Sequence, residues 1–152
     1  IKTKNKKMPI SIAISAFLFN CINGLLNGIY VGYFLESDIN INITFIIGVF
    51  LFITGMLINI QSDNKLISLR KDSDGYKIPN GGMFRLISCP NHFGEIIEWI
   101  GYSFIAFNFA ALSFALWTFF NLVPRALNHH EWYNEHFDNY PKKRKAVLPY
   151  IL

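Results

Sequence analysis

Residues 43–60 read ITFIIGVFLFITGMLINI and contain no Asp, Glu, Lys or Arg. A helix needs about 20 predominantly apolar residues to cross the roughly 30 Å hydrocarbon layer of a bilayer. The run is close to that length, and its apolar residues form one block instead of the spaced stripe of an amphipathic helix. We therefore predict that residues 43–60 form a membrane-spanning helix.

Two further apolar blocks flank this one, at residues 8–35 and 93–123. The first is long enough to span, whereas the apolar core of a signal peptide covers only about 7–15 residues. The second exceeds the length of one helix and has Asn108 near its middle. We predict two short helices there that turn near Asn108, with a single tilted crossing as the alternative.

Basic residues flank the apolar blocks and indicate the topology. They precede the first block, follow the second and follow the third: Lys2, Lys4, Lys6 and Lys7; Lys65, Arg70, Lys71, Lys77 and Arg85; Arg125, Lys142, Lys143, Arg144 and Lys145. The loop after the first block carries only Glu36 and Asp38. By the positive-inside rule, the N-terminus, the central loop and the tail face the cytosol, which requires the third block to cross an even number of times.

The composition supports a membrane protein over a soluble one. The 152 residues are 52% hydrophobic and 16% charged, against about 25% charged residues in a soluble domain. The net charge is +4, but the basic residues lie beside apolar blocks and no nucleic-acid-binding motif accompanies them. No nucleic-acid partner is therefore expected. Cys21 and Cys89 have no metal-site spacing and are expected to be free.

Residues 65–91 are polar and include the turn signals Asp74-Gly75 and Pro79-Asn80-Gly81-Gly82. We expect an ordered loop there and not a separate domain. The chain opens at Ile1 without an initiator methionine, so we expect it to be a fragment.

Asn59, Asp63 and Arg70 form a first polar stripe if the helix continues past Ile60. At 100° per residue, eleven steps return to within about 20° of the starting direction, so all three share one face. An amide, a carboxylate and a guanidinium could hold a carboxamide, ribose hydroxyls and a phosphate, because Arg matches phosphate oxygens bidentately. Interfacial solvation is the alternative.

Arg125, His129 and Tyr133 form a second stripe at helical spacing where the last apolar block ends. The two stripes lie at the same membrane depth and suggest one shared site. Pro124, directly before Arg125, disfavours a straight helix through that point.

Other chemical motifs are weaker. His129-His130-Glu131 fails the zinc-protease pattern because Asn occupies position 134, so no metal is expected. Glu95 and Glu98 lie near the start of an apolar block and are expected to orient other polar groups, with surface exposure as the alternative. The chain has neither GxGxxG between a strand and a helix nor a P-loop, so a nucleotide would have to bind between helices.

Five stretches together resemble the steroid 5α-reductase family. They are GMLINIQSD (55–63), YKIPNGGMF (76–84), FGEIIEWIGY (93–102), RALNHHEWY (125–133) and FDNYPKKRKAVLPYIL (137–152). The resemblance implies that residues 1–152 are the C-terminal part of one membrane-embedded domain. It further implies a seven-helix, all-α bundle in the endoplasmic-reticulum membrane, of which this chain supplies the last four helices.

The same resemblance implies an NADPH-dependent oxidoreductase that reduces the C4–C5 double bond of 3-oxo-Δ4 steroids by hydride transfer to C5 and protonation at C4. Family positions that contact the dinucleotide match Asn59, Asp63, Arg70, Asn91, Arg125, His129 and Tyr133, and other polar positions around it match Tyr76, Glu95 and Glu98. The family's keto-polarising Glu and Tyr belong to its N-terminal half, so no residue here is assigned that role.

Three other functions remain as alternatives. Related membrane reductases act on trans-2-enoyl-CoA in fatty-acid elongation or on polyprenols, although HHEWY and YKIPNGG look more like the steroid branch. A membrane protein that kept the fold as a non-catalytic scaffold is a third. A transporter is disfavoured, because the polar residues cluster at the cytosolic ends of the helices.

Overall fold

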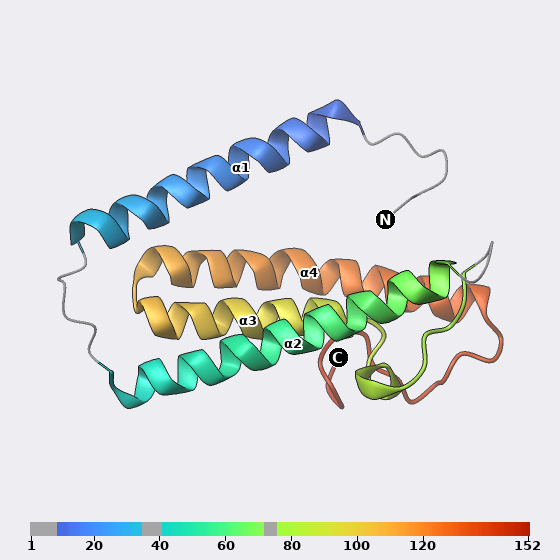
Figure 1. The fold of residues 1–152 in the computed structure, drawn as a ribbon. Coiled ribbons are helices and arrows are strands. Elements are labelled where there is room, and N and C mark those ends of the chain that lie inside the picture. The colour runs from blue at the N-terminus through green and yellow to red at the C-terminus, as the bar shows by residue number, and fades with distance from the viewer. Residues whose placement is uncertain (1–8, 35–40, 72–75) are drawn as a thin grey trace. The chain divides into compact units, whose positions relative to one another are not determined.

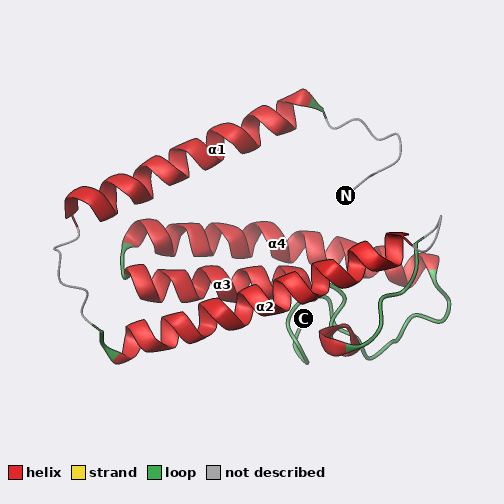
Figure 2. Cartoon of the chain, viewed as in Figure 1, coloured by secondary structure: helices red, strands yellow, loops and turns green. Residues whose placement is uncertain are grey.

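The computed structural model describes residues 9–34, 41–71 and 76–152. The chain divides into two compact units, Ile1–Asn40 and Ile41–Leu152. Figure 2 shows the described residues as helices joined by loops, with no strand drawn among them. The prediction of an all-α fold is confirmed.

The first unit contains helix α1, Ile10–Ile29, followed by a π-helical turn η1, Tyr30–Phe34. None of the residues of α1 is buried, and Gly24 does not interrupt the helix. Two of its polar side chains bond within the helix: Ser15 Oγ donates to the Ser11 carbonyl at 2.8 Å, and Asn20 Nδ2 to the Ala16 carbonyl at 2.8 Å. Internally satisfied polar groups suit a lipid environment, which offers them no water.

The second unit is built on three helices that lie side by side, α2 (Ile43–Lys71), α3 (Pro90–Ala106) and α4 (Phe109–His136), with a short 3-10 helix η2 (Gly82–Arg85) (Figure 1). Between α3 and α4, Phe107 adopts a left-handed conformation with φ of 44°. The Asn108 side chain then caps α4 by accepting from the Ala111 N–H at 2.8 Å. The predicted turn near Asn108 is confirmed.

Glycines set the close approach of α2 and α3. Gly48 and Gly55 on α2 face Gly101 and Gly94 on α3, so the two helices run antiparallel. A Cβ added at Gly48 would lie 2.9 Å from the Gly101 carbonyl oxygen, and one added at Gly94 would lie 2.6 Å from the Gly55 carbonyl oxygen. Only hydrogen fits at these positions, as in the small-residue interfaces of membrane helices.

The helix boundaries correct two expectations. Residues 65–71, predicted to begin the loop, belong to α2, because the helix continues past Ile60 to Lys71. Pro124 was expected to disfavour a straight helix, yet α4 continues through it. Leu122 and Ala126 on either side are buried in the core, and this packing offsets the one missing backbone hydrogen bond.

Three described helices, α1, α2 and α4, are long and apolar enough to cross a membrane. The chain therefore has the helices of a multi-pass membrane protein. Helix α3 has 17 residues, or about 26 Å at 1.5 Å per residue, and is slightly shorter than a typical crossing. A fourth crossing by α3 stays a prediction. The basic residues before α1, the acidic pair at 36 and 38, and the Asp74-Gly75 turn signal lie outside the described residues.

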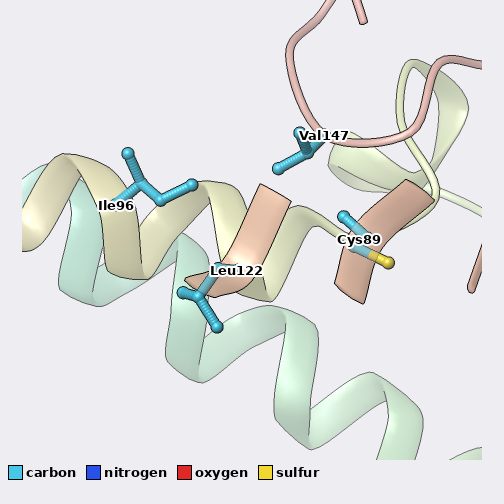
Figure 3. Close-up of a cluster of buried hydrophobic side chains, with 5 residues drawn as sticks. Cys89, Ile96, Leu122 and Val147 are labelled. Atoms are coloured by element: carbon cyan, nitrogen blue, oxygen red, sulfur yellow. The ribbon is translucent and has the colours of Figure 1, made fainter. Parts of the chain in front are cut away.

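The residues after α4 fold back onto α3 and α4. Ser88 N–H donates to the Lys145 carbonyl at 2.8 Å and Cys89 N–H to the Ala146 carbonyl at 3.0 Å. Figure 3 shows the buried cluster that these bonds position, in which Val147 lies with Cys89, Ile96 of α3 and Leu122 of α4. The C-terminal segment is thus part of the core.

Candidate functional site

The first polar stripe lies on one helix. Asn59, Asp63 and Arg70 all belong to α2, as the spacing required. Asn59 is half-buried. It lies where α2 meets α3, since a Cβ added at Gly94 of α3 would be 2.6 Å from the Asn59 backbone nitrogen. Asp63 and Arg70 are exposed. The stripe therefore runs from the contact with α3 to the end of α2.

Helix α3 places its acidic residues against this stripe. Glu95 and Glu98 are half-buried, and Asn91 occupies the first turn of the helix. The Glu95 carboxyl is within electrostatic range of Glu98, of Asp63 on α2 and of Arg125 on α4. The Glu95 carboxyl thus lies near charged side chains of α2, α3 and α4.

The second stripe also lies on one helix, since α4 carries Arg125, His129 and Tyr133. Arg125 and His129 are exposed and Tyr133 is half-buried. His92 of α3 faces this stripe, with its ring centroid 6.1 Å from that of His129. The His92 Nδ1 atom is buried and has no hydrogen-bond partner among the described residues. Sequence reasoning did not identify His92 as part of the site.

Aromatic rings connect the far ends of the two stripes. The Tyr76 ring lies 4.9 Å from that of Trp132 on α4, and the Arg70 guanidinium carbon lies 6.0 Å from the Tyr76 ring centroid. Tyr133 is within electrostatic range of both Arg70 and Tyr76. We call the region formed by both stripes, Tyr76 and the residues Asn91, Glu95 and Glu98 of α3 the polar end of the bundle. It comprises Asn59, Asp63, Arg70, Tyr76, Asn91, Glu95, Glu98, Arg125, His129 and Tyr133.

A hydrogen-bonded cluster that the sequence did not predict lies beside the polar end. Ser88 Oγ is 2.6 Å from His130 Nδ1 and 2.6 Å from the Tyr140 hydroxyl. Arg144, only 3% exposed, donates from Nη2 to Asn80 Oδ1 at 3.2 Å. The bonds from Ser88 to His130 and Tyr140 and from Arg144 to Asn80 join residues 42 to 64 apart in sequence, which no spacing pattern connects.

The thiols and histidines offer little further chemistry. Cys21 and Cys89 are free, as predicted. Burial raises the pKa of the Cys89 thiol to about 12, so it is neutral and poorly nucleophilic at physiological pH. Within residues 9–34, 41–71 and 76–152, no three His, Cys, Asp or Glu side chains form a group that could hold a metal ion.

The sequence matches one protein family across nearly its whole length. The profile described as 3-oxo-5-alpha-steroid 4-dehydrogenase covers residues 6–152. The helices α1, α2 and α4 are those of a multi-pass membrane protein. The chain belongs to the 3-oxo-5-alpha-steroid 4-dehydrogenase family.

Curated relatives agree with this assignment. The chain is 46% identical over 148 residues to the steroid 5-alpha-reductase DET2 of Arabidopsis thaliana, covering 94% of this chain and 56% of that protein. It is 43% identical over 149 residues to 3-oxo-5-alpha-steroid 4-dehydrogenase 1 of Homo sapiens, covering 96% of this chain and 58% of that protein. The chain therefore spans somewhat more than half the length of these relatives.

Proposed function

We propose that the full-length protein reduces the C4–C5 double bond of 3-oxo-Δ4 steroids with NADPH, and that the polar end of the bundle holds the cofactor. The observation that carries the proposal is the meeting of amide, carboxylate, guanidinium and aromatic groups from α2, α3 and α4 at one end of an apolar bundle. The names of the relatives support the steroid substrate.

The donors and acceptors at the polar end fit a phosphorylated dinucleotide. Arg70 and Arg125 are exposed guanidinium groups on two different helices, available to separate phosphates. Asp63 can accept hydrogen bonds from ribose hydroxyls, and Asn59 and Asn91 carry amides that match a carboxamide. The buried, unpartnered Nδ1 of His92 is a further polar atom that a ligand could satisfy.

Each group has a defined task in this proposal. NADPH, when bound, supplies the hydride that is transferred to C5 of the steroid. Asn59, Asp63, Arg70, Asn91, Arg125, His129 and Tyr133 bind and orient it, while Tyr76, Glu95 and Glu98 hold these side chains in place. The apolar helices around the polar end exclude water from the reacting atoms. No residue of this chain is assigned to polarise the steroid 3-keto group.

The membrane placement belongs to the same proposal. Basic residues at the polar end, including Lys65, Lys71 and Lys77, support a cytosolic orientation. NADPH would then reach the site from the cytosol, and the steroid from the membrane. We propose the endoplasmic-reticulum membrane as the location.

A parallel substrate assay tests the function. The full-length protein, expressed in microsomes, would receive NADPH with a 4-en-3-oxo steroid, a trans-2-enoyl-CoA or a polyprenol, and the products would be followed by mass. We expect a gain of two hydrogens in the steroid alone. Reduction of the acyl-CoA or the polyprenol alone would contradict the steroid substrate but keep the cofactor site, and turnover of none would favour a non-catalytic scaffold.

A further inference from the structure

Tyr140, which follows α4, packs directly against a residue of the proposed cofactor site. Its ring stacks on that of Tyr133, with ring centroids 5.3 Å apart and an angle of 9° between the planes. It also meets the His130 ring edge to face at 5.8 Å. Tyr140 is only 4% exposed, so its ring is enclosed. One face of Tyr133 is therefore covered by a buried aromatic ring.

The Tyr140 hydroxyl is held by two side chains. Arg144 donates to it from Nη1 at 3.4 Å, and Ser88 Oγ lies 2.6 Å away. Arg144 can only donate, so the Tyr140 hydroxyl oxygen accepts from it, and either hydroxyl can be the donor in the Ser88–Tyr140 bond. Ser88 Oγ also lies 2.6 Å from His130 Nδ1 and 3.1 Å from the Lys145 carbonyl oxygen. The hydroxyl end of the ring is thus fixed.

A guanidinium group also lies over the Tyr140 ring. The Arg144 guanidinium carbon lies 4.9 Å from the Tyr140 ring centroid, and the same guanidinium donates to Asn80 on the loop before η2. A guanidinium over an aromatic face is attracted by the ring quadrupole. The Tyr140 ring therefore contacts both Arg144 and Tyr133.

We propose that Tyr140 is a positioning residue for NADPH binding and acts through Tyr133. The inference rests on the proposed function, since it takes Tyr133 as part of the cofactor site. A stacked ring restricts the rotamers of Tyr133 before the cofactor arrives, and this preorganisation lowers the entropy cost of binding. Ser88 and Arg144 in turn hold Tyr140.

A double-mutant cycle in the full-length protein tests this role. The NADPH dissociation constant would be measured for Tyr140→Leu, Tyr133→Leu and the double variant. We expect each single change to weaken NADPH binding by about 3- to 10-fold, on the scale of one aromatic pair. The double variant should bind as weakly as Tyr133→Leu alone, because Tyr140 acts through Tyr133. The turnover number of Tyr140→Leu at saturating NADPH should change by less than about 2-fold.

Two further variants separate positioning from general stability. Tyr140→Phe keeps the ring and should bind NADPH within about 2-fold of the unchanged protein, as should Tyr150→Leu, a matched control at a tyrosine that is 80% exposed. If Tyr140→Leu does not fold, Tyr140→Met fills similar space without stacking and takes its place in the cycle.

The inference would be overturned if the fold-increases in the NADPH dissociation constant of the two single variants multiplied in the double variant. An unchanged dissociation constant in Tyr140→Leu would also overturn it, and either result would leave the proposed function intact. Failure of the unchanged full-length protein to bind NADPH would overturn the proposed function itself.

Discussion

At the scale of single residues, the polar end carries two exposed guanidinium groups on different helices, which we propose contact the phosphates of the dinucleotide. Arg70 is the last residue of the stripe on α2, and Arg125 is the first residue of the stripe on α4. The Glu95 carboxyl on α3 lies within electrostatic range of Arg125. Two cations at separate places can distinguish a cofactor with an extra phosphate from one without it.

Arg125→Ala in the full-length protein should weaken NADPH binding more than NADH binding. Loss of a hydrogen bond to a charged group costs about 1.5–3 kcal/mol, which corresponds to about 10- to 100-fold in the dissociation constant for NADPH. NADH lacks the 2′-phosphate, so its dissociation constant should rise much less. Titrating both cofactors measures the difference, with Arg85→Ala, an exposed arginine on η2, as the control. An equal loss for both cofactors would count against this role for Arg125.

The residues of the two stripes could be predicted because helical spacing alone puts each stripe on one face. Helical spacing could not predict which residues from elsewhere in the chain lie beside these stripes, namely Ser88, His92, Tyr140 and Arg144. The Ser88–His130 bond joins residues 42 apart in sequence, and the Arg144–Asn80 bond joins residues 64 apart. Such contacts depend on how the C-terminal segment folds back, and no local pattern encodes that path.

At the scale of elements, the register of α2 against α3 is fixed by two glycine pairs seven residues apart, Gly48 with Gly101 and Gly55 with Gly94. This register brings Asn59 to the start of α3 and so aligns the polar end. The sequence predicted both helices. It did not predict the pairing, because the glycines were hidden within uniformly apolar blocks.

Gly55→Ala should destabilise the bundle. The new Cβ would collide with the Glu98 backbone nitrogen and lie 2.5 Å from the Gly94 carbonyl oxygen, so two backbones would have to separate. Overpacking of this kind costs about 1–3 kcal/mol, more than the gain of roughly 1 kcal/mol from helix propensity. Thermal unfolding of the purified full-length protein should show a midpoint several degrees lower.

The matched control for that change is Gly24→Ala in α1, where nothing lies within 4 Å of the added Cβ. It should leave the midpoint unchanged or raise it slightly. Equal effects of the two substitutions would show that the α2–α3 contact does not depend on its glycines.

Helix ends proved harder to predict than helix positions. The turn at Asn108 was predictable, since an amide in an apolar block is a natural cap. The continuation of α4 through Pro124 could not be predicted. The expectation that proline disrupts a helix considers only local backbone bonding, whereas Leu122 and Ala126 are held by tertiary packing.

At the scale of the whole molecule, helices α2, α3 and α4 form a bundle whose apolar surfaces suit lipid and whose polar residues gather at one end. The family follows from the match over residues 6–152. The binding of NADPH at the polar end is the central claim, because the substrate proposal, the role of Arg125 and the role of Tyr140 all depend on it.

Photolabelling tests that claim most directly. The full-length protein would be irradiated with an azido-adenine analogue of NADP, digested, and mapped by mass spectrometry with and without excess NADPH. We expect labelled peptides from residues 59–98 or 125–133, with labelling suppressed by NADPH. Labelling confined to peptides outside these ranges, or labelling that excess NADPH does not reduce, would contradict a cofactor site at the polar end.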